Sequence, residues 1–82
     1  MVHSETSTAT ACDLQAIGAE VAGTDAILIA DCITSAGALP LRTDEWHVDI
    51  VAAGSQKAFM LPPGLAFVAV SEKAWKNVES IK

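Results

Sequence analysis

Three observations predict that this chain has an α/β fold, with a parallel sheet, crossover helices and a last strand that is antiparallel. Two short, nearly continuous apolar runs, residues 26–30 and 48–53, are typical of parallel strands covered on both faces. The apolar residues of segment 13–22 recur at helical spacing, as in a crossover helix. A third apolar run, residues 65–70, follows the second too closely for a crossover, and we therefore expect it to be antiparallel.

The N-terminal part is expected to contain a strand end, a polar loop and the crossover helix. Residues 1–3 have the pattern of the end of a strand, and residues 4–10 are rich in hydroxyl groups, as in a polar loop. Thr10 or Asp13 is suited to cap the helix, because a short polar side chain accepts a hydrogen bond from its first free N–H groups. Gly23 lies at the expected C-cap.

The remaining elements follow from the same rules. Gly18 should weaken the interior of the first helix by about 1 kcal/mol relative to alanine. Thr43 is expected to cap a single helical turn over residues 44–46. Ser71 is expected to cap a final amphipathic helix over residues 72–81. The apolar residues that share one face of that helix are Ala74, Trp75, Val78 and Ile81.

The composition is that of a small and apolar chain. It has 82 residues, 51% of them hydrophobic, and a mean hydropathy of +0.38. A chain of this length forms one domain at most, and an independent domain so small has too much surface for such an apolar composition. We therefore expect the 82 residues to be a piece of a larger sheet whose faces are covered.

Charge and pattern argue against several classes of function. The net charge of −5 and the pI near 4.6 do not suit nucleic-acid binding, which requires a basic surface. No apolar run approaches the roughly 20 residues of a membrane-spanning helix, and the polar start has no secretory signal. Cys12 and Cys32 lack the spacing of a metal or redox motif. They are interpreted as reduced, buried or half-buried residues of a cytoplasmic protein without a metal site.

Two charged residues follow the two apolar runs. Asp31 comes directly after residues 26–30, and Lys57 follows residues 48–53 after a short turn. Ligands of open parallel sheets bind outside the carboxyl ends of the strands, so both side chains should face one crevice. A plain ion pair is the general interpretation. Pyridoxal phosphate (PLP) offers another, because this cofactor needs a lysine for its Schiff base and an aspartate beside its pyridine nitrogen.

The sequence around these residues resembles the class V PLP-dependent aminotransferases, in particular the alanine–glyoxylate and serine–glyoxylate (serine–pyruvate) transaminase branch. The spacing of 26 residues between Asp31 and Lys57 is similar to that of the family. The resemblance implies that residues 1–82 are part of the large PLP-binding domain of a fold-type I enzyme, which forms a homodimer. The segments that carry the likeness are residues 3–8, 31–41, 44–58 and 61–64.

The resemblance also implies roles for four residues. Lys57 would form the Schiff base with PLP and move a proton during catalysis. Asp31 would hold the proton of the pyridine nitrogen, so that the ring can accept the charge of the carbanion. Gln56 would bind the cofactor phosphate, and the hydroxyl group of Thr6 would lie near the ring oxygen.

Other residues are expected to be structural. Ala9 and His47 stand where many relatives have glycine, which leaves the backbone conformation at Ala9 open. His47 and His3 are interpreted as surface loop histidines, with His3 lending at most a hydrogen bond near the Thr6 loop. Trp46 is expected to lie in the core or at an interface.

Two functions of different classes remain. The resemblance implies a transaminase that passes the amino group of a small amino acid, such as alanine or serine, to a small keto acid, such as glyoxylate or pyruvate. The alternative is a catalytically inactive α/β fragment that self-associates through its apolar faces.

Overall fold

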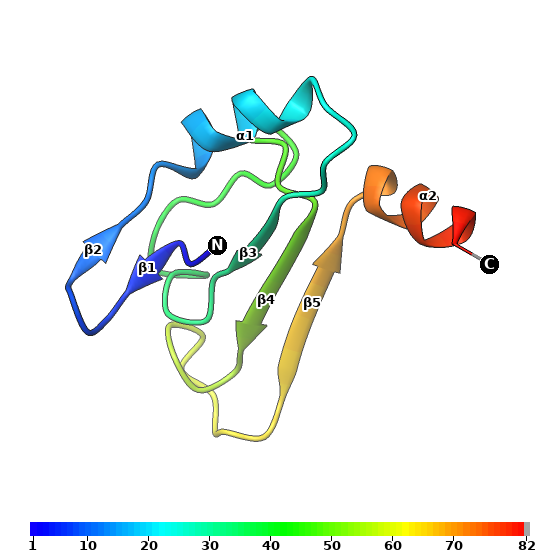
Figure 1. Cartoon of the computed structure of the whole chain (residues 1–82). Coiled ribbons are helices and arrows are strands. Elements are labelled where there is room, and N and C mark those ends of the chain that lie inside the picture. The colour runs from blue at the N-terminus through cyan, green and yellow to red at the C-terminus, as the bar shows by residue number, and fades with distance from the viewer. Residues whose placement is uncertain (82) are drawn as a thin grey trace.

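The computed structural model describes residues 1–81 and has the expected α/β architecture (Figure 1). β3 and β4 pair in parallel, β4 and β5 pair antiparallel, and the order in this sheet is β3-β4-β5. Both the parallel pair and the antiparallel last strand were predicted, and both are confirmed. The elements in chain order are β1 (Ser4–Glu5), β2 (Thr10–Ala11), α1 (Leu14–Ala22), β3 (Ile29–Asp31), β4 (Ile50–Gly54), β5 (Ala66–Val70) and α2 (Glu72–Ser80).

β3 and β4 begin later in the chain than residues 26 and 48, where the apolar pattern predicted their starts. The reason is a side chain that takes the place of a backbone partner. Oδ2 of Asp49 accepts a hydrogen bond from the N–H group of Leu28 at 2.9 Å. The backbone ladder between the two strands therefore starts at the carbonyl of Leu28, which accepts the N–H group of Ile50 at 3.1 Å, and not at its N–H group. β5 and both helices agree with the predicted bounds to within one residue.

The hydroxyl-rich run over residues 4–10 is part of a hairpin, so the prediction of a loop was wrong at its two ends. Ser4 pairs with Ala11 and Glu5 with Thr10. Each strand has only two residues, which is too short for an alternating pattern to appear in the sequence.

Residues 1–3 extend the sheet on the free side of β3, as their pattern predicted. Val2 forms a parallel bridge with Asp31. The Asp31 N–H group donates to the carbonyl of Met1 at 2.7 Å, and the His3 N–H group donates to the carbonyl of Asp31 at 2.9 Å. The end of β3 therefore has a neighbour on each side and is fixed within the sheet.

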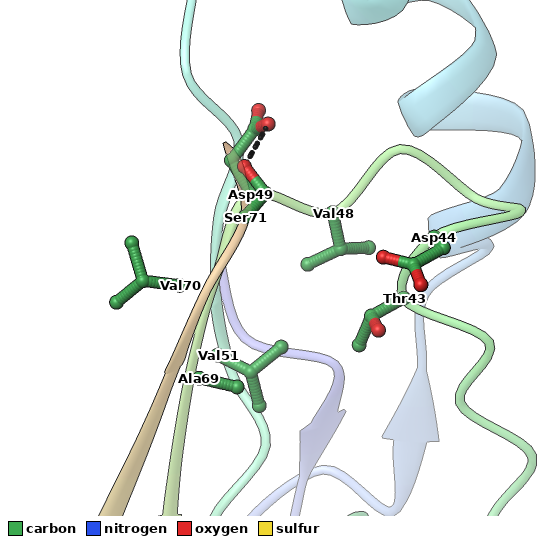
Figure 2. Close-up of a pocket in the computed structure, with 8 residues that line it drawn as sticks. All are labelled: Thr43, Asp44, Val48, Asp49, Val51, Ala69, Val70 and Ser71. Atoms are coloured by element: carbon green, nitrogen blue, oxygen red, sulfur yellow. Dashed lines mark hydrogen bonds between the residues drawn. The ribbon is translucent and has the colours of Figure 1, made fainter. Parts of the chain in front are cut away.

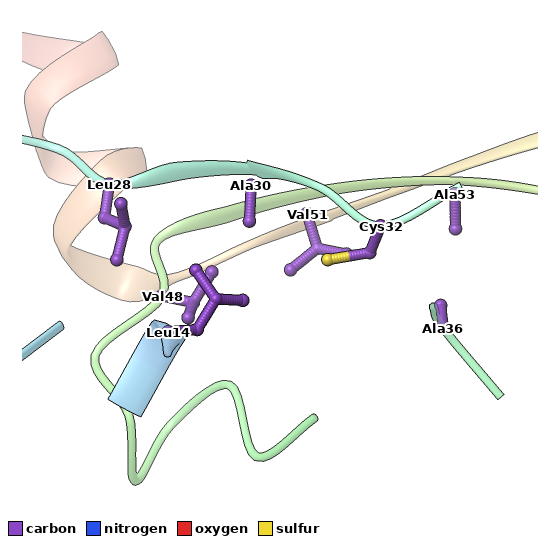
Figure 3. Packing of buried hydrophobic residues seen from close by; sticks show 8 residues of the cluster. All are labelled: Leu14, Leu28, Ala30, Cys32, Ala36, Val48, Val51 and Ala53. Atoms are coloured by element: carbon purple, nitrogen blue, oxygen red, sulfur yellow. The ribbon is translucent and has the colours of Figure 1, made fainter. Parts of the chain in front are cut away.

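α1 covers one face of the sheet and closes the hydrophobic core (Figure 3). Its N-cap is Asp13, whose carboxylate accepts the N–H group of Ala16 at 3.0 Å, and its C-cap is Gly23, as predicted. Trp46 packs against the core, which confirms its expected structural role. The buried cluster consists of Leu14, Leu28, Ala30, Cys32, Ala36, Val48, Val51 and Ala53.

The other face of the sheet is open within residues 1–81. Ile29, whose side chain alternates with the buried Ala30, is 53% exposed, and Val68 of β5 is 65% exposed. The predicted apolar face of α2 is covered only at Ala74, while Trp75 is 56% exposed. The composition predicted that both faces of the sheet are covered. The described residues cover one face at β3 and β4, and β5 is exposed on both of its faces.

Asp49 joins β3, β4 and α2 at the amino end of β4 (Figure 2). The residue is 5% exposed, and its Oδ1 accepts a hydrogen bond from the Ser71 hydroxyl at 2.8 Å. The Ser71 oxygen in turn accepts the N–H group of Ala74 at 3.1 Å, which confirms Ser71 as the cap of α2. With the N–H group of Leu28 bonded to Oδ2, both oxygens of this buried carboxyl group have hydrogen-bond partners.

Gly18 is needed for the contact between α1 and the turn before β4. A Cβ atom at this position would lie 1.6 Å from the carbonyl oxygen of Trp46. The backbone of the Trp46 turn therefore approaches the helix at a distance that no residue with a side chain allows.

We predict that Gly18→Ala destabilises the protein, although alanine has the higher helix propensity. The gain of about 1 kcal/mol in propensity is outweighed because α1 and the Trp46 turn must separate, and the net loss should exceed about 1 kcal/mol. Urea denaturation would measure it.

Gly23→Ala is the matched control, since nothing lies within 4 Å of its Cβ position and its φ of −83° suits any residue. The free energy of unfolding of this variant should stay the same or rise slightly. Equal losses in the two variants would contradict the proposed close contact at Gly18.

Candidate functional site

Three of the four predicted site residues lie around one pocket of about 260 Å³. Asp31 is the last residue of β3, Lys57 follows β4 after a short turn, and Thr6 lies in the β1–β2 hairpin. The pocket is therefore at the carboxyl ends of the parallel strands, where open α/β sheets bind ligands. Its lining residues are Val2, Ser4, Glu5, Thr6, Asp31, Ile33, Thr34 and Lys57.

Asp31 has one carboxylate oxygen engaged within the protein. Oδ1 accepts a hydrogen bond from the N–H group of Ile33 at 3.0 Å, which fixes the side chain in the turn after β3. Among residues 1–81 the ion pairs are Arg42 with Glu45 and Lys76 with Glu72. Asp31 and Lys57 thus share a pocket without forming the plain ion pair that was the general interpretation of their pattern.

Lys57 is exposed, and its loop is fixed by a buried hydroxyl group. Ser55 is 0% exposed; its Oγ donates to the carbonyl of Pro62 at 2.8 Å and accepts the N–H group of Leu65 at 3.3 Å. The backbone of Ser55 also bonds to Leu65 and Leu61. No role was predicted for Ser55, although a serine after a buried strand and before a proline-rich loop is a signal for such a contact.

Gln56, the fourth predicted residue, does not line this pocket. It is exposed, and its side-chain amide lies over Gly54, with Oε1 3.0 Å from the place that a Cβ of Gly54 would take. The carboxamide lies beside the backbone at the end of β4, next to the turn that carries Lys57.

The hairpin that carries Thr6 contains a residue with an unusual backbone. Ala9 has a φ of 53°, in the left-handed region that favours glycine, and its N–H group donates to the carbonyl of Thr6 at 3.3 Å. This resolves the backbone conformation that was left open at Ala9. In the same hairpin, hydrogen bonds from the Ser7 hydroxyl and N–H groups lower the pKa of Glu5 and favour its charged form.

A buried polar group lies on the core side of the Asp31 turn. His3 is 5% exposed, so its interpretation as a surface histidine was wrong, and its Nδ1 is 2.8 Å from the hydroxyl of Ser35. Burial raises the pKa of the neighbouring Cys32 thiol, and a hydrogen bond with Ser35 acts in the opposite direction. Cys12 and Cys32 are free, and His47 is exposed, as expected.

Within residues 1–81, no three or more His, Cys, Asp or Glu side chains are grouped so that they could hold a metal ion. The same part of the chain contains no helix of the length and hydropathy needed to cross a membrane.

Comparison with known proteins gives relatives across the whole chain. A soluble hydrogenase small subunit of Synechococcus sp. (strain PCC 6716) is 53% identical over 77 residues, which are 93% of this chain and 20% of the relative. L-aspartate–glyoxylate aminotransferase of Paracoccus denitrificans (strain Pd 1222) is 45% identical over 82 residues, 98% of this chain and 21% of the relative. The chain spans about a fifth of the length of the curated relatives it matches.

The comparison of structures and the comparison with family profiles both give aminotransferases. The crystal structure of ureidoglycine–glyoxylate aminotransferase from Bacillus subtilis superposes with a TM-score of 0.92 at 34% identity, over 98% of this chain and 21% of that one. This confirms the predicted fold class. The sequence profile of the family Aminotransferase class-V matches residues 1–82, the full chain. The protein therefore belongs to the class-V aminotransferase family.

Proposed function

We propose that this protein is part of a PLP-dependent aminotransferase, with residues 1–82 forming part of its large, cofactor-binding domain. The observation that carries the proposal is the convergence of Asp31, Lys57 and Thr6 on one pocket at the carboxyl ends of two parallel strands. An acid, a primary amine and a hydroxyl group come there from three separate segments of the chain.

These residues fit PLP by their chemistry. The Oδ2 atom of Asp31 has no hydrogen-bond partner among residues 1–81, and it is suited to hold the proton of a pyridine nitrogen. Lys57, which forms no ion pair within the same residues, would hold the cofactor covalently and then move a proton at the substrate α-carbon. When bound, PLP supplies an electron sink for the charge at that carbon.

Two further residues would complete the binding of the cofactor. The Thr6 hydroxyl would donate a hydrogen bond to the hydroxyl oxygen on the pyridine ring of PLP, and the Gln56 carboxamide would donate one to the phosphate. Gln56 would have to turn from Gly54 to do so, a rotation that an exposed side chain makes freely.

The substrates are proposed from the relatives. The names of the Paracoccus denitrificans and Bacillus subtilis proteins both include glyoxylate as a substrate of an aminotransferase. We propose that the amino group passes from a small amino acid, such as alanine or serine, to glyoxylate or pyruvate. The whole enzyme would act as a cytoplasmic homodimer.

One prediction from the proposed function concerns attachment of the cofactor. PLP titration of the chain followed by borohydride reduction should give one reduced adduct, located by peptide mass mapping at Lys57. Lys57→Ala should abolish it, and Asp31→Asn should shift or weaken the visible absorption band because the ring nitrogen loses its anionic partner.

Lys76→Ala is the control, because Lys76 is exposed on α2 and pairs only with Glu72. This variant should label at Lys57 like the unchanged chain. Absence of a band, or an adduct spread over Lys73 and Lys76, would contradict the cofactor site and favour the inactive, self-associating alternative.

Another prediction concerns the loop that presents Lys57. Ser55→Ala leaves the Pro62 carbonyl and the Leu65 N–H group without their hydroxyl partner, and should reduce the free energy of unfolding by about 1–3 kcal/mol. Amide hydrogen exchange should accelerate between residues 55 and 65.

Ser80→Ala is a suitable comparison, since the Ser80 hydroxyl bonds only to Asn77 on the exposed end of α2. Its stability should stay within about 0.5 kcal/mol of the unchanged chain. If Ser55→Ala changed the free energy of unfolding as little as Ser80→Ala, the buried hydroxyl of Ser55 would not be what fixes the loop.

A further inference from the structure

We propose that the buried hydrogen bond between His3 and Ser35 positions the two walls of the cofactor pocket, the Asp31 turn and the Thr6 hairpin, relative to each other. His3 and Ser35 are thus positioning residues that do not touch the cofactor. The inference rests on the proposed function, because it assumes that this pocket holds PLP.

The pair is buried and joined directly to Asp31. His3 is 5% and Ser35 0% exposed, and Nδ1 and Oγ are 2.8 Å apart across 32 residues of sequence. The His3 N–H group donates to the carbonyl of Asp31, and the Ser35 N–H group donates to the carbonyl of Cys32, the residue after Asp31. The backbones of the two residues are therefore bonded to the end of β3, His3 at Asp31 and Ser35 at Cys32.

The pair lies directly behind the pocket wall. In the N-terminal segment, Val2 and Ser4 line the pocket, whereas His3 between them is buried. In the turn that follows Asp31, residues 31–36, Thr34 lines the pocket and the adjacent Ser35 is buried. Each segment therefore presents one side to the pocket, and the hydrogen bond joins the two segments on the other side.

A second contact joins the same segments at the pocket itself. The Thr34 hydroxyl donates to the carbonyl of Ser4 at 3.0 Å. Residues 3 and 4 are thus bonded to residues 35 and 34, once on the core side and once on the pocket side. These two bonds fix the start of the hairpin, two residues before Thr6, to the turn that follows Asp31.

The use of a polar pair here favours a positioning role over simple packing. Burial of an imidazole and a hydroxyl group costs free energy of desolvation unless the two form a hydrogen bond. An apolar pair would fill this space without that cost. A hydrogen bond is directional, whereas apolar contacts tolerate sliding, and a fully paired buried polar group specifies one arrangement. That property is useful where two segments must present Asp31 and Thr6 to one planar ring.

The test compares variants that break this bond with one that breaks a similar bond elsewhere. Ser35→Ala and His3→Leu remove it, and His3→Asn retains a side-chain amide that can replace Nδ1. Ser71→Ala is the control, because it removes a hydroxyl that bonds the buried Asp49 and caps α2 at the opposite end of the sheet. Two quantities are measured for each variant. One is the rate of amide hydrogen exchange without cofactor, and the other is the Kd for PLP, determined from the visible absorption band.

We expect Ser35→Ala and His3→Leu to accelerate exchange in both segments, residues 4–8 and 31–36, and to raise the Kd for PLP about tenfold. The double variant should show no larger effect than either single one, since both remove the same bond. His3→Asn should restore most of the affinity. Ser71→Ala should lower stability to a similar degree without changing the Kd.

Two results would overturn the inference. One is a Kd for PLP that rises in proportion to the loss of stability in every variant, so that Ser71→Ala raises it as much as Ser35→Ala does. The other is faster exchange confined to one of the two segments, which would show that the bond does not couple them. Failure of the unchanged chain to form the Lys57 adduct would instead refute the proposed function, and the exchange measurement would still decide whether His3 and Ser35 couple the segments.

Discussion

The parallel register of β3 and β4 is the constraint on which the candidate site depends. Asp31 is opposite Ala52, and the ladder continues with a hydrogen bond from the Cys32 N–H group to the Ala52 carbonyl at 2.8 Å. Because both strands run in the same direction, the chain leaves β4 at the same edge where Asp31 ends β3. A slip of one residue would turn the Asp31 side chain toward the core and remove the acid from the pocket.

The two ends of the sheet are each fixed by buried polar groups, but these serve different purposes. At the amino end of β4, Asp49 holds Leu28 and Ser71 and so sets where the strands begin and where α2 starts. At the carboxyl end, Ser55 and the pair of His3 and Ser35 hold the loops around the pocket. No buried side-chain nitrogen or oxygen within the described residues lacks a partner. The loops are therefore held by directional contacts rather than by apolar packing alone.

Local patterns in the sequence predicted both long helices, Asp13 as one of two candidate caps for the first and Ser71 as the cap of the second. They also predicted the direction of each main strand and the position of Asp31 and Lys57 at one edge of the sheet. The burial of His3 and the partner of its hydrogen bond could not be predicted in this way, because Ser35 is 32 residues away and only the folded sheet brings the two together. The starts of β3 and β4 were predicted too early for a similar reason. The N–H group of Leu28 bonds to the Asp49 carboxylate and not to a backbone carbonyl, and an apolar pattern does not indicate such a bond.

The backbone at Ala9 shows how the pairing within the β1–β2 hairpin acts on one wall of the pocket. Ala9 and His47 have φ values of 53° and 57°, at positions where the family resemblance implies glycine. Histidine tolerates this region better than alanine, for which it costs about 1–2 kcal/mol. Ala9 has no local preference for its conformation, so the pairing of β1 with β2 and the bond to Thr6 must impose it. The geometry that presents Thr6 to the pocket thus follows from the pairing within the hairpin, whose first strand is bonded through Ser4 to the turn after Asp31.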